Sequence, residues 1–143
     1  MKILLAFIGK TKSKEISVLV ERYITMSRKF VSIATVELKE KQDPSAQFKE
    51  LRKHLDEKSF WVVLHDRGEE MDSEKFANFL KDKLASQKQI IFISGGFYGV
   101  PLDKYDKILS LSKMTFSHEL IRAMLAEQIY RALAIIYGHP YPK

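Results

Sequence analysis

The chain has 143 residues, of which 45% are hydrophobic and 29% charged, and its formal net charge is +6. This length and apolar content predict one folded domain, residues 1–143, and exclude a disordered chain. The absence of cysteine excludes disulfides and thiolate metal sites and suits the cytoplasm. No apolar run reaches the roughly 18–20 residues that a membrane span requires, so we expect no membrane partner. The basic charge favours a polyanionic partner only weakly, because many basic proteins never bind nucleic acid.

Apolar runs and helical patterns alternate along the chain. Residues 3–8 form a short apolar run that predicts a first strand better than a signal peptide. The next elements are a helix over residues 13–29 and a strand over 31–38, and then a second helix with Asp43 as N-cap and Pro44 at its first position. A buried strand over 60–64 ends at Leu64, and it is followed by a helix over 73–84 and a strand over 88–94.

This alternation predicts an α/β fold with a parallel sheet and right-handed crossovers. The strands are continuously apolar, which indicates that helices cover both faces of the sheet. Ligands of such sheets bind beyond the carboxyl ends of the strands. Here those ends are the segments that follow Ile8, Leu64 and Ile93.

A final helix is predicted from Ser117, a suitable N-cap, to about Tyr137. Its apolar stripe is broader than one sheet face needs. The breadth fits either a symmetric dimer interface or a helix that lies at the centre of the monomer. Glu127 and Arg131 have the i, i+4 spacing of an ion pair on this helix, and their roles are expected to be structural.

The segment from Gly95 to Gly99 places three glycines directly after the last predicted strand. Its spacing matches neither the dinucleotide-binding pattern nor a phosphate-binding loop. Taken alone, it predicts a tight turn or a ligand loop. No nucleophile elbow is present, and the four histidines lack the spacing of a metal site. Asp66 beside His65 is expected to be loop polarity rather than a catalytic dyad.

The glycine segment, the run from Leu111 to Phe116, His118, and the tail from His139 to Tyr141 occur in an order that resembles a known family. The chain is similar, over essentially its full length, to the bacterial ribosomal RNA large subunit methyltransferase H family of the SPOUT class. The resemblance implies an α/β fold with a C-terminal deep trefoil knot and a homodimer. It also implies an S-adenosylmethionine-dependent enzyme that methylates N3 of a pseudouridine in 23S rRNA on assembled ribosomes, without a metal.

Carried over by motif, the resemblance assigns cofactor-binding residues to two loops and one strand end. They are Leu64, Gly95, Gly96, Leu111, Ser112, Lys113, Met114, Thr115 and Phe116. Backbone groups in these loops would hold the cofactor. The N3 of pseudouridine is a poor nucleophile until it loses its proton, so a base or a cation is needed nearby. His118 and Arg122 are the candidates for that catalytic role.

The tail residues His139, Tyr141 and Lys143 are candidate contacts to rRNA, by stacking and by phosphate binding. Family members commonly end in Tyr-His-Lys or Tyr-His-Arg, whereas this chain has Pro142 before its lysine. The alternative function is a catalytically silent ribosome-binding protein of the same fold. A generic α/β nucleotide-binding or hydrolase domain is disfavoured by the missing motifs.

Overall fold

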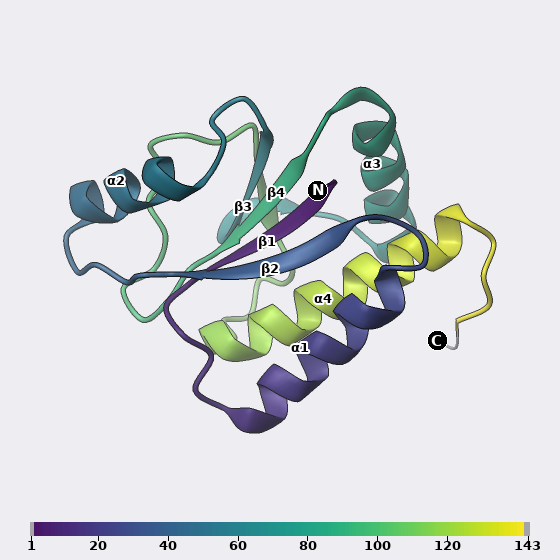
Figure 1. Ribbon diagram of the computed structural model, residues 1–143, viewed down its shortest axis with the longest axis horizontal. Helices are drawn as coiled ribbons and strands as arrows, with labels where there is room; N and C mark the ends of the chain where they lie inside the picture. The colour runs from purple at the N-terminus through teal and green to yellow at the C-terminus, as the bar shows by residue number, and fades with distance from the viewer. Residues whose placement is uncertain (1, 142–143) are drawn as a thin grey trace.

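The computed structural model describes residues 2–141, and strands and helices alternate along most of this range (Figure 1). The elements are β1 (Ile3–Ile8), α1 (Lys14–Ser27), β2 (Ile33–Leu38), α2 (Pro44–His54), β3 (Phe60–Glu70), α3 (Ser73–Ser86), β4 (Ile90–Ser94), β5 (Lys107–Ser110) and α4 (His118–Ile136).

The five strands form one sheet in the order β2-β1-β4-β3-β5, and every neighbouring pair is parallel. In β1, Ile3 is in register with Ile33 of β2 and with Ile90 of β4. All residues of β4 are buried, as expected for a central strand that is covered on both faces. The predicted parallel α/β fold is confirmed.

Helices cover both faces of the sheet (Figure 1). On one face, Leu51 and Leu55 of the α2 segment pack with Trp61 and with alternate residues of β1 and β4. On the other face, α1, α3 and α4 share a larger core, in which Val20, Phe76 and Leu125 are buried. Residues within each central strand therefore alternate between two cores, which explains the continuous apolar runs in the sequence.

Polar side chains begin the helices where the sequence predicts it. Asp43, the residue before Pro44, accepts a hydrogen bond from the Ala46 amide at the start of α2. Ser117 accepts one from the Leu120 amide at the start of α4. The end of α4 is set by Gly138, whose φ is +66°. The His139 amide donates to the Ala134 carbonyl over 2.8 Å, which is the bond that closes a helix at a left-handed glycine.

The predicted end of the third strand at Leu64 is wrong, because β3 continues to Glu70. Residues 65–68 bulge out of the ladder, so that Leu109 of β5 pairs with both Leu64 and Glu69. Beyond Leu64 the strand pairs with β5 alone and its side chains become exposed or half-buried. The run of buried apolar residues therefore ends at Leu64, whereas the strand continues to Glu70.

The broad apolar stripe of α4 is largely explained within the monomer. The helix packs between α1 and α3, and it buries Leu125, Ile129 and Leu133 completely. Leu120 and Ile135 remain 47% exposed on the outer side of the same helix. Central packing thus accounts for most of the stripe and leaves part of it uncovered.

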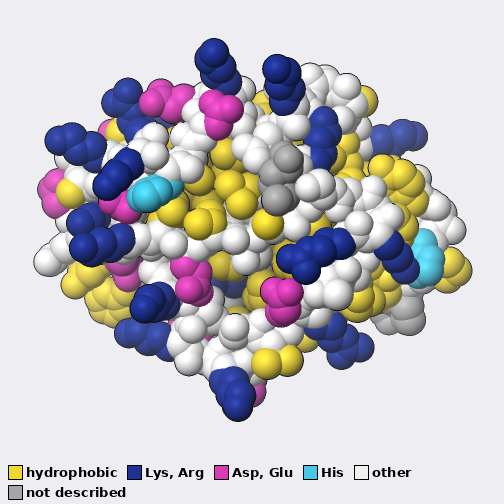
Figure 2. All heavy atoms as spheres, in the orientation of Figure 1, with side chains coloured by type: hydrophobic (Ala, Val, Ile, Leu, Met, Phe, Trp, Pro, Cys, Tyr) yellow, Lys and Arg dark blue, Asp and Glu magenta, His cyan; other side chains and the backbone are white. Residues whose placement is uncertain are grey.

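Lys and Arg side chains are distributed around the rim of the face shown in Figure 2, and hydrophobic side chains gather near its centre over the sheet. The net positive charge is therefore not confined to one patch on this face. No helix within residues 2–141 has the length and apolarity to cross a membrane.

Gly68→Ala tests the close packing of the bulge on β5. A Cβ at position 68 would lie 2.6 Å from the Ile108 carbonyl carbon and 2.7 Å from the Leu109 amide nitrogen. Because backbone atoms cannot move aside cheaply, we expect the free energy of unfolding to fall by about 3 kcal/mol, measured by urea denaturation. Gly138→Ala is the control, because its Cβ meets open space and only the positive φ is strained, at a cost of about 1 kcal/mol. A loss at Gly68 no larger than at Gly138 would contradict this packing.

Candidate functional site

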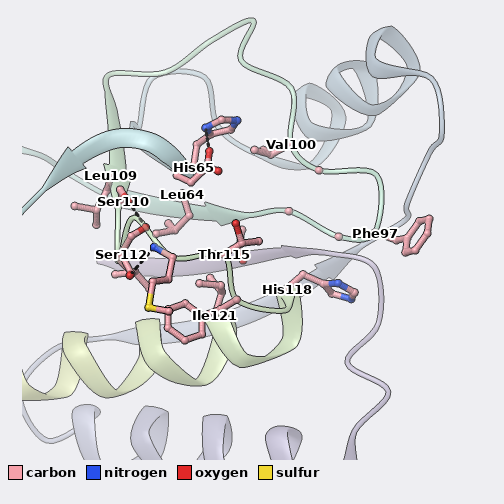
Figure 3. A pocket seen from close by; sticks show the side chains of 18 of the residues that line it. Leu64, His65, Phe97, Val100, Leu109, Ser110, Ser112, Thr115, His118 and Ile121 are labelled. Carbon is pink, nitrogen blue, oxygen red and sulfur yellow. Dashed lines mark hydrogen bonds and ion pairs between the residues drawn. The ribbon is translucent and has the colours of Figure 1, made fainter.

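A pocket of about 510 Å³ opens beyond the carboxyl ends of β4 and β5, beside the bulge of β3. Leu64 lines it from the residue before the β3 bulge, and Ser94 and Ser110 line it from the ends of β4 and β5. The first turn of α4 closes one side with His118 (Figure 3). This position is the expected one, because ligands of parallel sheets bind where strand ends and loops leave a crevice. The size is within the range of small-molecule sites.

The first wall of the pocket is the loop of residues 95–99. The Gly99 amide donates to the Gly96 carbonyl over 3.0 Å, which folds the loop back on itself. A Cβ at Gly95 would lie 2.8 Å from the Gly99 carbonyl carbon, and Gly99 has a φ of +84°. Glycine is therefore required for this turn, and at Gly95, Gly96 and Gly99 the wall is backbone alone.

The second wall is the loop of residues 111–116, between β5 and α4. Ser110 Oγ donates to the Ser112 carbonyl over 2.8 Å, and Ser112 Oγ accepts from the Met114 amide over 3.0 Å. These local hydrogen bonds hold the loop in a compact turn. Ser117 then caps α4 and directs its first turn toward the pocket.

Eight of the nine predicted cofactor-binding residues line this pocket. They are Leu64, Gly95, Gly96, Leu111, Ser112, Met114, Thr115 and Phe116. The exception is Lys113, whose side chain is 88% exposed and lies 3.8 Å from Glu70 Oε1. Lys113 thus belongs to the same loop, but its side chain is directed to the surface.

The two candidate catalytic residues lie in different places. His118 lines the pocket, whereas Arg122, one turn later on α4, is completely buried and does not line it. The Arg122 guanidinium donates to the Ile8 carbonyl over 2.6 Å and to Thr11 Oγ1 over 2.8 Å, and it lies 4.9 Å from the centre of the Phe7 ring. These contacts connect the end of β1 to α4.

The charge of Arg122 is balanced by carboxylates around it. Burial lowers the pKa of its guanidinium, and Glu37, Glu119 and Glu40 oppose that shift. Two of these carboxylates also accept backbone hydrogen bonds from the chain after β1, Glu37 from Thr11 over 2.7 Å and Glu119 from Ser13 over 2.8 Å. Hydrogen bonds from the Ser13 and Lys12 amides lower the pKa of Glu119.

The tail lies at the other end of α4. With 19 residues at 1.5 Å each, the helix separates His118 from the tail by about 28 Å. His139 lies 3.2 Å from Lys29 Nζ and packs against the Phe30 ring. Lys143 and Pro142 are outside the described residues. The structure therefore does not bring the tail to the pocket of its own chain.

Tyr141 is fixed to the C-terminal end of α4. Its ring packs edge-on against Tyr130 and lies 4.6 Å from the Arg131 guanidinium, which forms the predicted ion pair with Glu127 at 2.8 Å. Burial raises the pKa of the Tyr141 hydroxyl well above its ordinary value, and hydrogen bonds to Tyr23 and Glu127 add to the shift.

Sequence reasoning missed several pocket residues. His65 and Asp66 in the β3 bulge both line it, and His65 Nδ1 lies 3.0 Å from Asp66 Oδ1 and 3.0 Å from the Arg67 amide. Phe97 and Tyr98 line it from the glycine loop. The sequence indicated these four residues only by their position after predicted strands. The bulge that carries His65 and Asp66 cannot be recognised from the apolar pattern.

The described residues of the pocket can hold a small organic molecule through backbone amides, carbonyls and hydroxyls. Within residues 2–141, no group of three or more His, Cys, Asp or Glu residues is arranged to hold a metal ion. One imidazole, His118, stands at the N-terminal end of α4, where the helix dipole favours negative charge. A histidine at this position can accept a proton, and the helix end can stabilise negative charge nearby.

Arg122→Met tests whether the guanidinium is structural. The substitution leaves the Ile8 carbonyl and the Thr11 hydroxyl without their donors, so we expect the free energy of unfolding to fall by about 2–4 kcal/mol in a denaturant titration. Arg22→Met, at an exposed position of α1, is the matched control and should change stability by less than about 0.5 kcal/mol. Unchanged stability of Arg122→Met would contradict the bridging role and favour a purely catalytic one.

Comparison with known proteins assigns the chain to a family. Residues 1–142 match the family model described as predicted SPOUT methyltransferase. Three relatives are each described as ribosomal RNA large subunit methyltransferase H. The protein of Trichlorobacter lovleyi is 34% identical, with 99% of both chains covered. That of Malacoplasma penetrans is 36% identical over the whole of both chains. That of Thermodesulfovibrio yellowstonii is 37% identical, with 93% of this chain and 92% of the relative covered. The chain therefore belongs to the SPOUT methyltransferases and, within them, to the ribosomal RNA large subunit methyltransferase H family.

Proposed function

We propose that this chain transfers a methyl group from S-adenosylmethionine to N3 of a pseudouridine in 23S rRNA, on assembled ribosomes in the cytoplasm. Full-length similarity to ribosomal RNA large subunit methyltransferases H carries this proposal. The whole activity would lie in one domain, residues 1–143, and the chain beyond β4 would be threaded as a deep trefoil knot.

The pocket beyond β4 and β5, beside the β3 bulge, fits S-adenosylmethionine in size and in chemistry. Its volume of about 510 Å³ suits a molecule of that size. Its walls combine apolar side chains, among them Leu64, Leu109 and Ile121, with glycine backbone and small polar side chains, which can hold an adenine ring and an amino-acid group without a phosphate cradle. When bound there, S-adenosylmethionine supplies an electrophilic methyl group on a sulfonium.

His118 is the residue that we assign to proton removal. It is the pocket histidine on α4, and N3 must lose its proton before it can attack a methyl group. The negative charge that develops on the pseudouridine ring is stabilised by the N-terminal end of α4. Arg122 would act indirectly, because its guanidinium holds the end of β1 and the following loop rather than the pocket.

We further propose a homodimer. A second groove, of about 620 Å³, runs beside α1, α3 and α4, and its lining includes Leu19, Met71, Leu120 and Met124. Val18, the residue before Leu19 on α1, is 62% exposed. A second copy of the chain would cover this apolar surface. It would also allow the tail of one subunit to approach the pocket of the other.

Two measurements test the proposed function. Isothermal titration with S-adenosylmethionine should give saturable binding, and ribosomes from a strain that lacks the modification should accept a methyl group at N3 of one pseudouridine of 23S rRNA. Binding without transfer would overturn the proposed substrate. No binding would favour the alternative, a silent ribosome-binding protein of the same fold.

Gly96→Val should weaken S-adenosylmethionine binding by about tenfold or more. The added Cβ would lie 2.6 Å from the Ile8 carbonyl oxygen and 2.5 Å from Glu40 Oε2, so the glycine loop must shift and change the shape of the pocket. Titration calorimetry measures the affinity, and light scattering should show an unchanged oligomeric state. Ala85→Val, at an exposed position of α3 away from the pocket, is the control and should bind normally. Normal binding by Gly96→Val would refute the assignment of this loop to the cofactor.

His118→Gln should lower kcat for methyl transfer to ribosomes by about 10²–10⁴-fold, the usual contribution of a positioned base. The dissociation constant for S-adenosylmethionine should stay within about threefold, because both glycine-loop and 111–116-loop walls are unchanged. His54→Gln, on α2 and away from the pocket, is the control and should retain full activity. A His118→Gln enzyme with wild-type kcat would exclude His118 as the base.

A further inference from the structure

Two aromatic side chains stand exposed at the mouth of the pocket. Phe97 is 78% exposed and Tyr98 is 54% exposed, and their rings meet edge to face at 5.1 Å. In Figure 3, Phe97 points away from the other labelled side chains, out of the pocket. An apolar ring this exposed contributes almost nothing to the core, and its loop is already closed by backbone bonds.

The loop that carries these rings is tied to the ends of β1 and β2. Glu40 Oε2 accepts from the Tyr98 amide over 3.0 Å, and the Glu40 side chain also packs against Gly9 and Gly96. Glu40 thus fixes the direction in which the rings leave the loop. It follows β2 and lies 58 residues before Tyr98 in the chain.

Lysines flank the residues of this contact along the chain. Lys39 and Lys41 flank Glu40, and Lys10 follows Gly9, with Lys12 two residues later. Lys10, Lys12 and Lys39 are exposed and Lys41 is half-buried. The acidic groups of this edge are directed at backbone amides, Glu37 at Thr11 and Glu119 at Lys12 and Ser13. Lysines therefore follow β1 and β2, the two strands to whose ends the aromatic loop is tied.

We propose that Phe97 and Tyr98, with Lys10, Lys12, Lys39 and Lys41, form a binding surface for single-stranded nucleotides next to the target base. The rings stack on unpaired bases and the lysines contact the adjoining phosphates, which is the combination that binds unpaired nucleic acid. Glu40 is a positioning residue for this surface. The proposal rests on the proposed function, because it assigns the RNA that is being methylated to one edge of the sheet.

Phe97→Ala and Phe97→Trp test the stacking, after the wild-type chain has been shown to methylate ribosomes. Loss of one stack should lower kcat/KM for ribosomes by about 5- to 150-fold, with the dissociation constant for S-adenosylmethionine within about threefold of wild type. Phe97→Trp should restore kcat/KM to within about threefold. Tyr105→Ala is the matched control, because Tyr105 is a 48% exposed aromatic residue that follows β4 but does not line the pocket.

The Phe97→Trp variant also reports stacking directly. Trp61 is fully buried and is the only natural tryptophan, so the indole introduced by the substitution gives the solvent-exposed emission. Titration with a ten-nucleotide oligouridylate should quench this emission, while the same titration of Tyr105→Trp should not. Equal quenching in both variants, or none in Phe97→Trp, would overturn the stacking.

The lysines are tested through salt dependence. Lys39→Gln with Lys41→Gln should reduce the slope of log affinity for the oligouridylate against log salt by about one for each lost phosphate contact. Lys53→Gln with Lys58→Gln, at exposed positions in and after α2, should leave the slope unchanged. Unchanged kcat/KM in Phe97→Ala, or loss of the dimer in that variant, would assign the rings to another role and overturn the proposal while leaving the methyltransferase activity intact.

Discussion

The buried guanidinium of Arg122 is the contact on which the carboxyl edge of the sheet depends. A charge in a protein interior must be compensated by hydrogen bonds and opposite charge. Arg122 donates to the Ile8 carbonyl and to Thr11, lies against the Phe7 ring, and faces three carboxylates. Its Nε has no hydrogen-bond partner among the described residues. The two terminal nitrogens alone therefore make the hydrogen bonds to Ile8 and Thr11. The start of α4, with His118, is thereby held against the end of β1.

The three carboxylates around Arg122 hold the loops of this edge through backbone amides. Glu37 fixes the loop after β1, Glu119 fixes the start of α1, and Glu40 fixes the glycine loop. Because these loops are anchored by side chains from neighbouring elements, they need little apolar packing of their own. They can remain small and glycine-rich, and they leave room for a ligand at the strand ends.

The sequence predicted the parallel α/β fold and most element positions, because apolar runs, helical spacing and N-caps are local signals. It located the pocket through the glycine segment and the run from Leu111 to Phe116. It could not reveal the bulge of residues 65–68. Beyond Leu64 the strand pairs with β5 alone and its side chains are not buried, so no apolar pattern marks it. Nor could it assign Arg122 to the β1 end or Glu40 to the glycine loop. Those contacts join segments 114 and 58 residues apart, and no local pattern encodes them.

The order of strands in the sheet has a consequence for how the chain folds as it is synthesised. β4 lies between β1 and β3, so β3 has no strand to pair with until residues 90–94 have been made. Before β4 is made, only the β1–β2 pair of the sheet can assemble. Each of the remaining parallel pairs joins strands that are separated by a long stretch of chain. Such non-local pairing slows folding and leaves apolar strand edges open in the meantime. The interval between the synthesis of β3 and that of β4 is therefore the period in which the nascent chain is most exposed to aggregation.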